Sequence, residues 1–132
     1  MKFQAAIAII SFCFFQNAQA ICNSGEVGIG RKQEYQFIDE YDDQLIADNW
    51  VIAANNCNDI GVSEYGYKDD ACSAGPGYGP NNGVGSCTGN DNEPGFVWTA
   101  GGNFHNCYSV SDACETGPGL YEYIYWCCQP WN

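Results

Sequence analysis

The sequence predicts a small α+β domain in which a mainly antiparallel sheet, one longer helix and one short helix are held together by disulfides. Eight cysteines follow a short N-terminal leader, and an even number of cysteines in a short secreted chain indicates a disulfide framework. Four segments rich in aromatic and β-branched residues indicate strands, and one acidic segment has apolar residues at helical spacing.

Residues 1–20 have the pattern of a secretory signal peptide. Lys2 gives a positive start, residues 5–15 are apolar, and Ala18 and Ala20 form a small-x-small cleavage site. The apolar stretch is shorter than the roughly 20 residues that a membrane helix needs. We therefore expect cleavage before Ile21, secretion to the extracellular space, and one disulfide-rich domain over residues 21–132.

The first expected element is an amphipathic helix over residues 33–48, because apolar residues recur there at three- and four-residue steps. The acids of this segment are expected on its solvated side: Asp39, Glu40, Asp42 and Asp43. A carboxylate pair for glycoside hydrolysis is the sharper alternative. A second, short helix is expected over residues 109–115, where Ser109 and Asp112 resemble a capping box.

Strands are expected at residues 50–54, 60–67, 96–100 and 120–126. Alternation in the last segment places Tyr121, Tyr123 and Tyr125 on one face. It places Leu120, Ile124 and Trp126 on the other, with Glu122 among them. Residues 73–95 form a long glycine-rich loop, for which a functional and an inert interpretation are both open.

The cysteines that remain after cleavage are expected to form four disulfides: Cys22, Cys57, Cys72, Cys87, Cys107, Cys114, Cys127 and Cys128. A structural zinc site would need CxxC or Cys/His spacing, which the sequence lacks. Adjacent side chains at Cys127 and Cys128 point in different directions, so we expect two separate partners. One of these two cysteines is expected to pair with Cys22.

An internal repeat is visible in the sequence. The octapeptide DACSAGPG at residues 70–77 recurs as DACETGPG at residues 112–119, with six of eight positions identical. A diverged duplication with related halves at 50–87 and 96–127 explains it, and a Pro-Gly turn used twice is the alternative. Each half would contain three cysteines, so each needs at least one disulfide to a cysteine outside it.

Charge excludes several partners. After cleavage, the bases Arg31, Lys32 and Lys68 face 16 acids, which gives a net charge of −13. We therefore expect neither nucleic-acid binding nor membrane insertion, since both partners favour clusters of Lys and Arg. His105 is expected at the surface, and residues 90–93 offer oxygen ligands but lack the spacing of a calcium loop. We predict a monomer with no catalytic residue, metal or cofactor.

Aromatic and amide side chains are abundant, and this combination suits a binding surface. The candidate binding residues are Tyr121, Tyr123, Tyr125 and Trp131, whereas Trp50 and Trp98 are expected in the core. No Asn-x-Ser/Thr acceptor site for N-glycosylation occurs.

The overall plan of signal peptide, about 100 mature residues, eight cysteines and no catalytic motif resembles the small cysteine-rich secreted proteins of plant-associated fungi. That resemblance implies a non-enzymatic effector or virulence-type protein that binds a host protein, in the apoplast or after uptake into host cells. Two alternatives stay open. One is a carbohydrate-binding module for chitin or another wall glycan, and the other is a small secreted hydrolase or ribonuclease-like enzyme.

Overall fold

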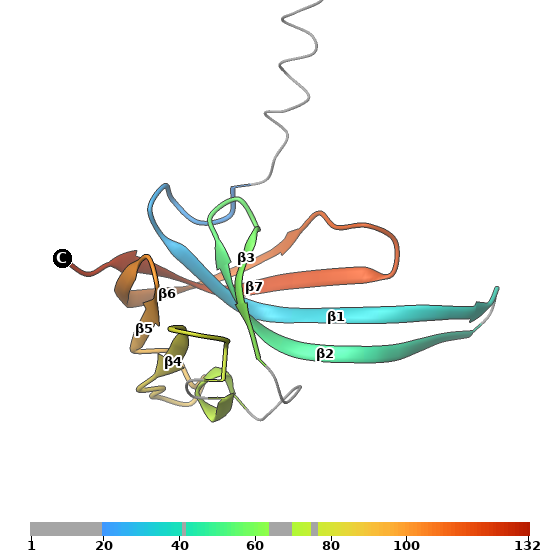
Figure 1. Cartoon of the computed structure of the whole chain (residues 1–132), viewed down its shortest axis with the longest axis horizontal. Helices are drawn as coiled ribbons and strands as arrows, with labels where there is room; N and C mark the ends of the chain where they lie inside the picture. The colour runs from blue at the N-terminus through green and yellow to red at the C-terminus, as the bar shows by residue number, and fades with distance from the viewer. Residues whose placement is uncertain (1–19, 41, 64–69, 75–76) are drawn as a thin grey trace, which may run out of the picture.

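The structure is a computed structural model that describes residues 20–40, 42–63, 70–74 and 77–132. Its elements are β1 (Val27–Asp39), β2 (Asp42–Ala54), β3 (Asp59–Val62), the 3-10 turn η1 (Ala71–Ala74), β4 (Gly83–Gly85), β5 (Phe96–Thr99), β6 (Gly102–Cys114) and β7 (Leu120–Pro130). The strands form one antiparallel sheet in the order β3-β2-β1-β7-β6-β5-β4 (Figure 1). The predicted signal peptide lies outside the described residues, except for Ala20.

The predicted α+β class is wrong, because the described residues contain no α-helix. The expected helix over residues 33–48 is the hairpin of β1 and β2. Its helical spacing is produced by the turn after Asp39 and by a β-bulge, where Glu34 pairs with Ala47 but Tyr35 pairs with Leu45. The extra residue Ile46 shifts the alternation of the strand by one position. The apolar residues of the hairpin are then spaced three and four residues apart, as in an amphipathic helix.

The expected short helix over residues 109–115 is also wrong, because β6 continues to Cys114. Pairing with β7 overrides the capping-box signal at Ser109 and Asp112. The four predicted strand segments are confirmed within β2, β3, β5 and β7. Only the start of the segment 60–67 is tested, since residues 64–69 lie outside the described part of the chain.

Two buried clusters lie on opposite faces of the sheet. The larger includes Ile29 and Ile52, and it is covered by Tyr78, Val84 and Val97 from the η1–β5 region. The Tyr78 hydroxyl donates to the Ala71 carbonyl at 2.7 Å, and burial raises the pKa of Tyr78. The smaller cluster includes the next residue of β2, Ala53, because neighbouring residues of a strand face opposite sides. It also holds Ile124 and the Cys22–Cys127 disulfide.

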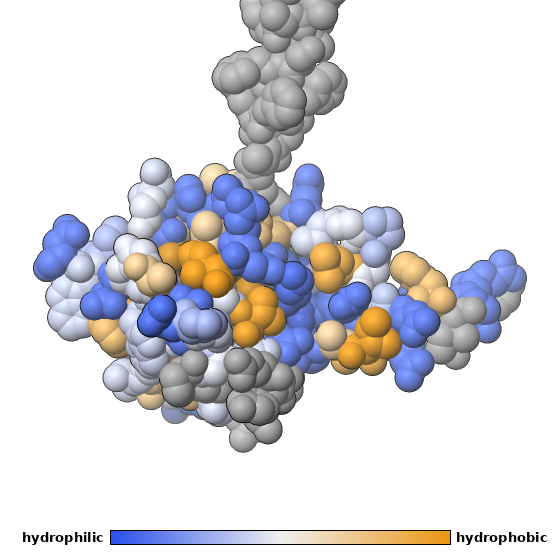
Figure 2. All heavy atoms as spheres, in the orientation of Figure 1, coloured by the Kyte–Doolittle hydropathy of each residue, from blue (hydrophilic) through white to orange (hydrophobic). Residues whose placement is uncertain are grey.

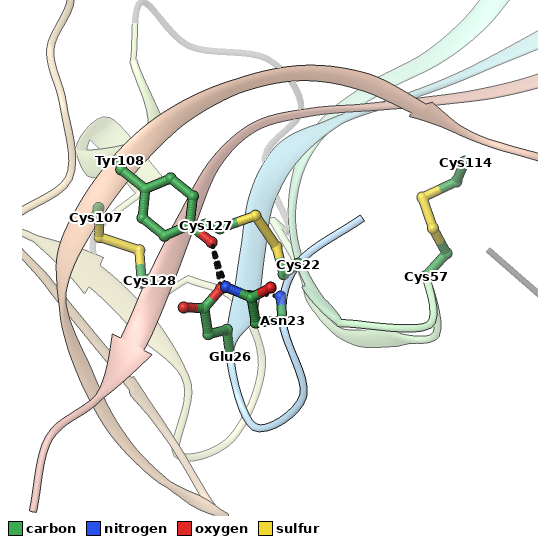
Figure 3. Close-up of a disulfide and its surroundings, with 9 residues drawn as sticks. All are labelled: Cys22, Asn23, Glu26, Cys57, Cys107, Tyr108, Cys114, Cys127 and Cys128. Carbon is green, nitrogen blue, oxygen red and sulfur yellow. Dashed lines mark hydrogen bonds between the residues drawn. A yellow bond between two sulfur atoms is a disulfide. The ribbon is translucent and has the colours of Figure 1, made fainter. Parts of the chain in front are cut away.

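The eight cysteines of the described residues all form disulfides, which confirms the prediction: Cys22–Cys127, Cys57–Cys114, Cys72–Cys87 and Cys107–Cys128. As expected, Cys127 and Cys128 form disulfides with different cysteines, and the partner of Cys127 is Cys22 (Figure 3). Beside this junction Tyr108 donates a hydrogen bond to Glu26, which raises the pKa of Tyr108 to about 12. The end of the chain is therefore fastened both to the N-terminal segment and to β6.

The two copies of the octapeptide adopt different structures. Residues 71–74 of the first copy form η1, whereas residues 112–114 of the second end β6. The bridges differ as well, since Cys72 pairs with Cys87 but Cys114 pairs with Cys57. The duplication stays a prediction about sequence history, and the halves 50–87 and 96–127 are not equivalent in structure.

The far part of the β1–β2 hairpin projects from the rest of the sheet, and we call residues 35–40 and 42–46 the arm (Figure 1). Within the described residues, β7 pairs with β1 as far as Glu34, and β3 pairs with β2 from Val51 onward. Both apolar and hydrophilic patches lie along the arm (Figure 2). The arm is thus a two-stranded ribbon that continues out of a sheet with a core.

Candidate functional site

Three of the four predicted binding residues lie on one face of the sheet. Alternation along β1 and pairing with β7 place Arg31 beside Tyr123 and Gln33 beside Tyr121. We call the surface formed by Arg31, Gln33, Tyr35, Tyr121, Tyr123 and Tyr125 the tyrosine face. The sequence indicated the residues from β7 but not those from β1. No local signal marks these β1 residues, because they join the site only through strand pairing.

A shallow depression on this face is lined by Gln33, Tyr35, Asp43, Tyr121 and Tyr123. The rings of Tyr35 and Tyr121 meet edge to face, with centroids 5.5 Å apart and planes at 84°. Tyr121 and Tyr123 are exposed, while the carboxylate of Asp43 and the amide of Gln33 supply hydrogen-bonding groups. The depression therefore combines aromatic surface with polar side chains.

A second depression adjoins the first and is lined by Arg31, Trp50, Asp91, Ser109, Val110, Tyr125 and Trp126. A β-bulge forms it, because Ile29 pairs with Trp126 whereas Gly30 pairs with Ile124, which leaves Tyr125 as the extra residue. The ring centroid of Trp50 lies 6.1 Å from that of Tyr125 and 6.3 Å from that of Trp126.

This bulge corrects the predicted alternation, in which Trp126 faces away from Tyr125. It also requires glycine on the opposing strand. A Cβ atom at Gly30 would lie 1.8 Å from the Tyr123 carbonyl oxygen, far inside contact distance. The alternation still holds before the bulge, where Glu122 and Ile124 are buried and Tyr121 and Tyr123 are exposed.

The positive charge on this face is neutralised locally. Arg31 makes a two-point ion pair with Asp48, one contact being Nε to Oδ1 at 3.2 Å. The Gln33 amide donates to the same carboxylate at 3.4 Å. Asp43 and Asp91 at the two depressions keep the surrounding surface acidic.

The fourth predicted binding residue, Trp131, lies elsewhere. Its ring stacks on His105 with centroids 4.6 Å apart and planes at 10°, and it meets Phe96 edge to face at 5.4 Å. The Trp131 N–H donates to the Asn103 carbonyl at 2.8 Å. Trp131 is 53% exposed and belongs to a separate aromatic cluster beside β5 and β6. Of the two tryptophans predicted for the core, Trp50 is buried and Trp98 is half-buried.

The acids considered for a carboxylate pair lie at the tip of the arm. Asp39, Glu40 and Asp43 are exposed, as predicted, although on a hairpin and not on a helix. In the described part of the chain, two groups of side chains have the proximity of metal ligands. Both contain cysteines that are already joined in disulfides, Cys22–Cys127 and Cys72–Cys87. Residues 90–93 form neither group.

A buried acid on the opposite face was not predicted as a functional residue. Glu122 is 3% exposed, and its Oε1 atom has no hydrogen-bond partner. Burial is the main cause that raises the pKa of Glu122 to about 8. A hydrogen bond with Asp59 and the negative charge of Asp59 raise this pKa further, whereas the positive charge of Lys32 lowers it. Lys32 forms an ion pair with Asp59, and that hydrogen bond raises the pKa of Lys32. The signal in the sequence was an acid on the apolar side of an alternating strand.

Comparison with protein-family models, curated proteins and solved structures finds no match to this chain. Within the described residues, none of the elements is a helix of sufficient length and apolar character to cross a membrane. The four disulfides are consistent with an extracellular protein.

Proposed function

We propose that this chain is a secreted, non-enzymatic effector-type protein that binds a host protein through the tyrosine face and the adjoining arm. The observation that carries the proposal is the exposure of large apolar side chains on these neighbouring strands. Phe37 is 57%, Leu45 43%, Ile46 51%, Tyr121 45% and Tyr123 39% exposed. Exposed apolar surface of this extent, rimmed by polar residues, is typical of a protein-interaction site.

The exposed residues belong to one connected surface. Tyr35 pairs with Leu45 across the arm, and its ring meets that of Tyr121 on β7. A Cβ atom at Gly119 would lie 3.3 Å from the ring of Phe37, so the turn before β7 lies against the arm. Phe37 lies six positions after Arg31 in β1, which corresponds to a length of about 20 Å along the strand.

The partner is expected to have basic residues around an apolar groove. The mature chain has a net charge of −13, and Glu40 and Asp43 are exposed near the end of the arm. The two bases in the described part of the chain, Arg31 and Lys32, form ion pairs with Asp48 and Asp59. Complementary charge would accelerate the encounter with a basic partner and help to orient it.

A glycan is the second candidate ligand. The depression lined by Tyr35, Tyr121 and Tyr123 with Gln33 and Asp43 offers ring faces for stacking and polar atoms for hydroxyl groups. Glycan binding leaves the exposed aliphatic side chains Leu45 and Ile46 without a role, and for this reason we favour a protein partner. The proposal assigns no catalytic residue, since neither depression includes His105 or Glu122 in its lining.

The test begins with cross-linking of the secreted protein in host extracellular fluid. Each captured protein is then purified, and its dissociation constant is measured directly. A Tyr121→Ser/Tyr123→Ser variant should bind at least about tenfold more weakly, because exposed tyrosines at interface centres contribute most of the affinity. The matched control Trp131→Ser, which changes an exposed aromatic residue outside the tyrosine face, should bind within about twofold of wild type.

Two outcomes would contradict the proposal. Equal affinity of the double variant and the wild type would remove the tyrosine face as the binding surface. Retention of the wild type on insoluble chitin or glucan, lost in the double variant, would establish the glycan in place of the protein partner. Peptide mapping that finds all four disulfides in each variant excludes misfolding as the cause.

A further inference from the structure

The outer edge of β2 has no strand partner over much of its length in the described part of the chain. β3 pairs with β2 at Val51, Ile52 and Ala53, and a last backbone bond joins Ser63 N–H to the Trp50 carbonyl at 2.9 Å. Residues 42–49 continue the strand beyond this point. An open strand edge is a template for pairing with another chain.

The hydrogen bonds at both ends of this stretch define which backbone groups face outward. Trp50 donates its N–H to Ser63 Oγ at 3.0 Å and accepts from Ser63 N–H, so its backbone groups face away from β1. At the other end, Tyr35 N–H donates to the Gly119 carbonyl at 2.7 Å, on the side of β7. Tyr35 therefore exchanges no hydrogen bonds with its opposite residue, Leu45.

The N–H and C=O of Leu45 consequently point outward, and alternation gives the same direction at Asp43 and Asp48. The edge contains neither Lys nor Pro, two of the devices by which natural edge strands avoid pairing. It carries acids and an exposed apolar side chain instead. Outward backbone groups and the Leu45 side chain are the elements that a strand-addition site needs.

We propose that an extended, basic segment of the partner protein adds to the outer edge of β2 as a further strand of the sheet. This inference rests on the proposed function and specifies how the partner binds. On the face that Asp43 and Leu45 share, a lysine of the segment would lie opposite Asp43 and an apolar residue opposite Leu45. Opposite charges across a strand pair are favourable.

A second copy of this chain would not pair well with the outer edge of β2, because of the charge of that edge. Pairing of two β2 edges would bring the acids of both copies together, and like charges directly opposite one another destabilise a strand pair. The acidic edge thus disfavours self-association and selects a cationic segment.

The experiment uses the full mature chain and a synthetic ten-residue peptide in which Lys and Val alternate at every second position with Thr between them, so that both types lie on one face, and binding is followed by amide NMR. Binding should shift the amide resonances of Asp43, Leu45 and Asp48 and slow their exchange with solvent. A peptide with the same side chains but with N-methyl groups along its pairing edge should bind at least about tenfold more weakly, because it lacks the backbone donors. A Glu/Val peptide should also bind more weakly than the Lys/Val peptide.

A pair of variants separates backbone pairing from side-chain contact. Leu45→Pro removes an outward N–H without removing a β1–β2 hydrogen bond, and should weaken binding at least about tenfold. Leu45→Thr keeps the N–H and should stay within about threefold of wild type. If Leu45→Pro disturbs the fold, the N-methylated peptide tests the same donors with the wild-type chain.

Equal binding of the normal and N-methylated peptides, or shifts confined to the tyrosine face, would overturn strand addition. Self-association of the chain through Leu45 would also overturn it. The proposed function fails in a different way. If Tyr121→Ser/Tyr123→Ser loses the host protein and Leu45→Pro keeps it, only strand addition is wrong.

Discussion

The disulfide-bonded body and the arm are built from the same two strands but differ in what stabilises them. Ile52 and Ile46 both lie in β2, yet the first is fully buried and the second is 51% exposed. All four disulfides and both buried clusters belong to the body. The arm contains no cysteine, and its residues Phe37, Leu45 and Ile46 are exposed.

The difference indicates a division of roles along one hairpin. A two-stranded ribbon without a covering layer is marginally stable by itself. The arm remains ordered because β1 and β2 continue into the body, where β7 and β3 pair with them. Substitutions in the body should therefore change stability, while substitutions on the arm should change binding.

Removal of the bridge between Cys57 and Cys114 should have a larger effect than the substitutions that follow. A Cys57→Ala/Cys114→Ala variant loses a cross-link that closes 57 residues, and its free energy of unfolding should fall by up to about 4 kcal/mol. Cys72→Ala/Cys87→Ala opens a 15-residue loop and should lose somewhat less, about 3 kcal/mol. Chemical denaturation measures both. A loss under about 1 kcal/mol for the longer loop would show that the body does not depend on this bridge.

A matched pair of isoleucines tests the division directly. Ile52→Ala should lower the free energy of unfolding by about 3 kcal/mol, because it removes a buried side chain and leaves a cavity. Ile46→Ala should change it by less than about 0.5 kcal/mol, since that side chain is already exposed. Thermal and denaturant unfolding of both variants provide the measurement. Similar losses at the two positions would mean that the arm is part of the folded core.

A smaller effect is expected from the pH dependence at Glu122. Its pKa is raised from 4.5 to about 8 in the folded chain, so the folded chain binds more protons than the unfolded chain between these values. Stability from this group is complete below pH 4.5 and is lost as the pH rises through 8. Glu122→Gln should reduce the decline in the free energy of unfolding across this range, because Gln does not titrate.

Denaturation at a series of pH values measures that decline. Glu40→Gln, an exposed acid on the arm, serves as the control and should keep the wild-type slope. Identical slopes for Glu122→Gln and wild type would show that the buried acid is not the group responsible.

The sequence predicted those parts of the molecule that have local signals. Alternation marked Tyr121 and Tyr123 as outward residues, and the even number of cysteines after residue 20 predicted complete pairing. The β1–β2 hairpin was mistaken for a helix, because Ile46 is an extra residue within one strand and no local pattern distinguishes such a bulge from a helical step. Gln33 joined the site only through its pairing with Tyr121, a contact between opposite ends of the chain.

The bulge at Tyr125 has a consequence for oxidative folding. Beyond it, Cys128 lies opposite Val27 and Cys127 opposite Gly28, which places the two cysteines on opposite faces of β7. The Cys22 sulfur lies 3.3 Å from the position of a Gly28 Cβ, on the face of Cys127. If the same residues paired one to one, without the bulge, Cys127 would lie opposite Val27 and Cys128 would lie on the face of Cys22. The bulge at one residue therefore determines which of the two adjacent cysteines faces Cys22 and which faces Cys107.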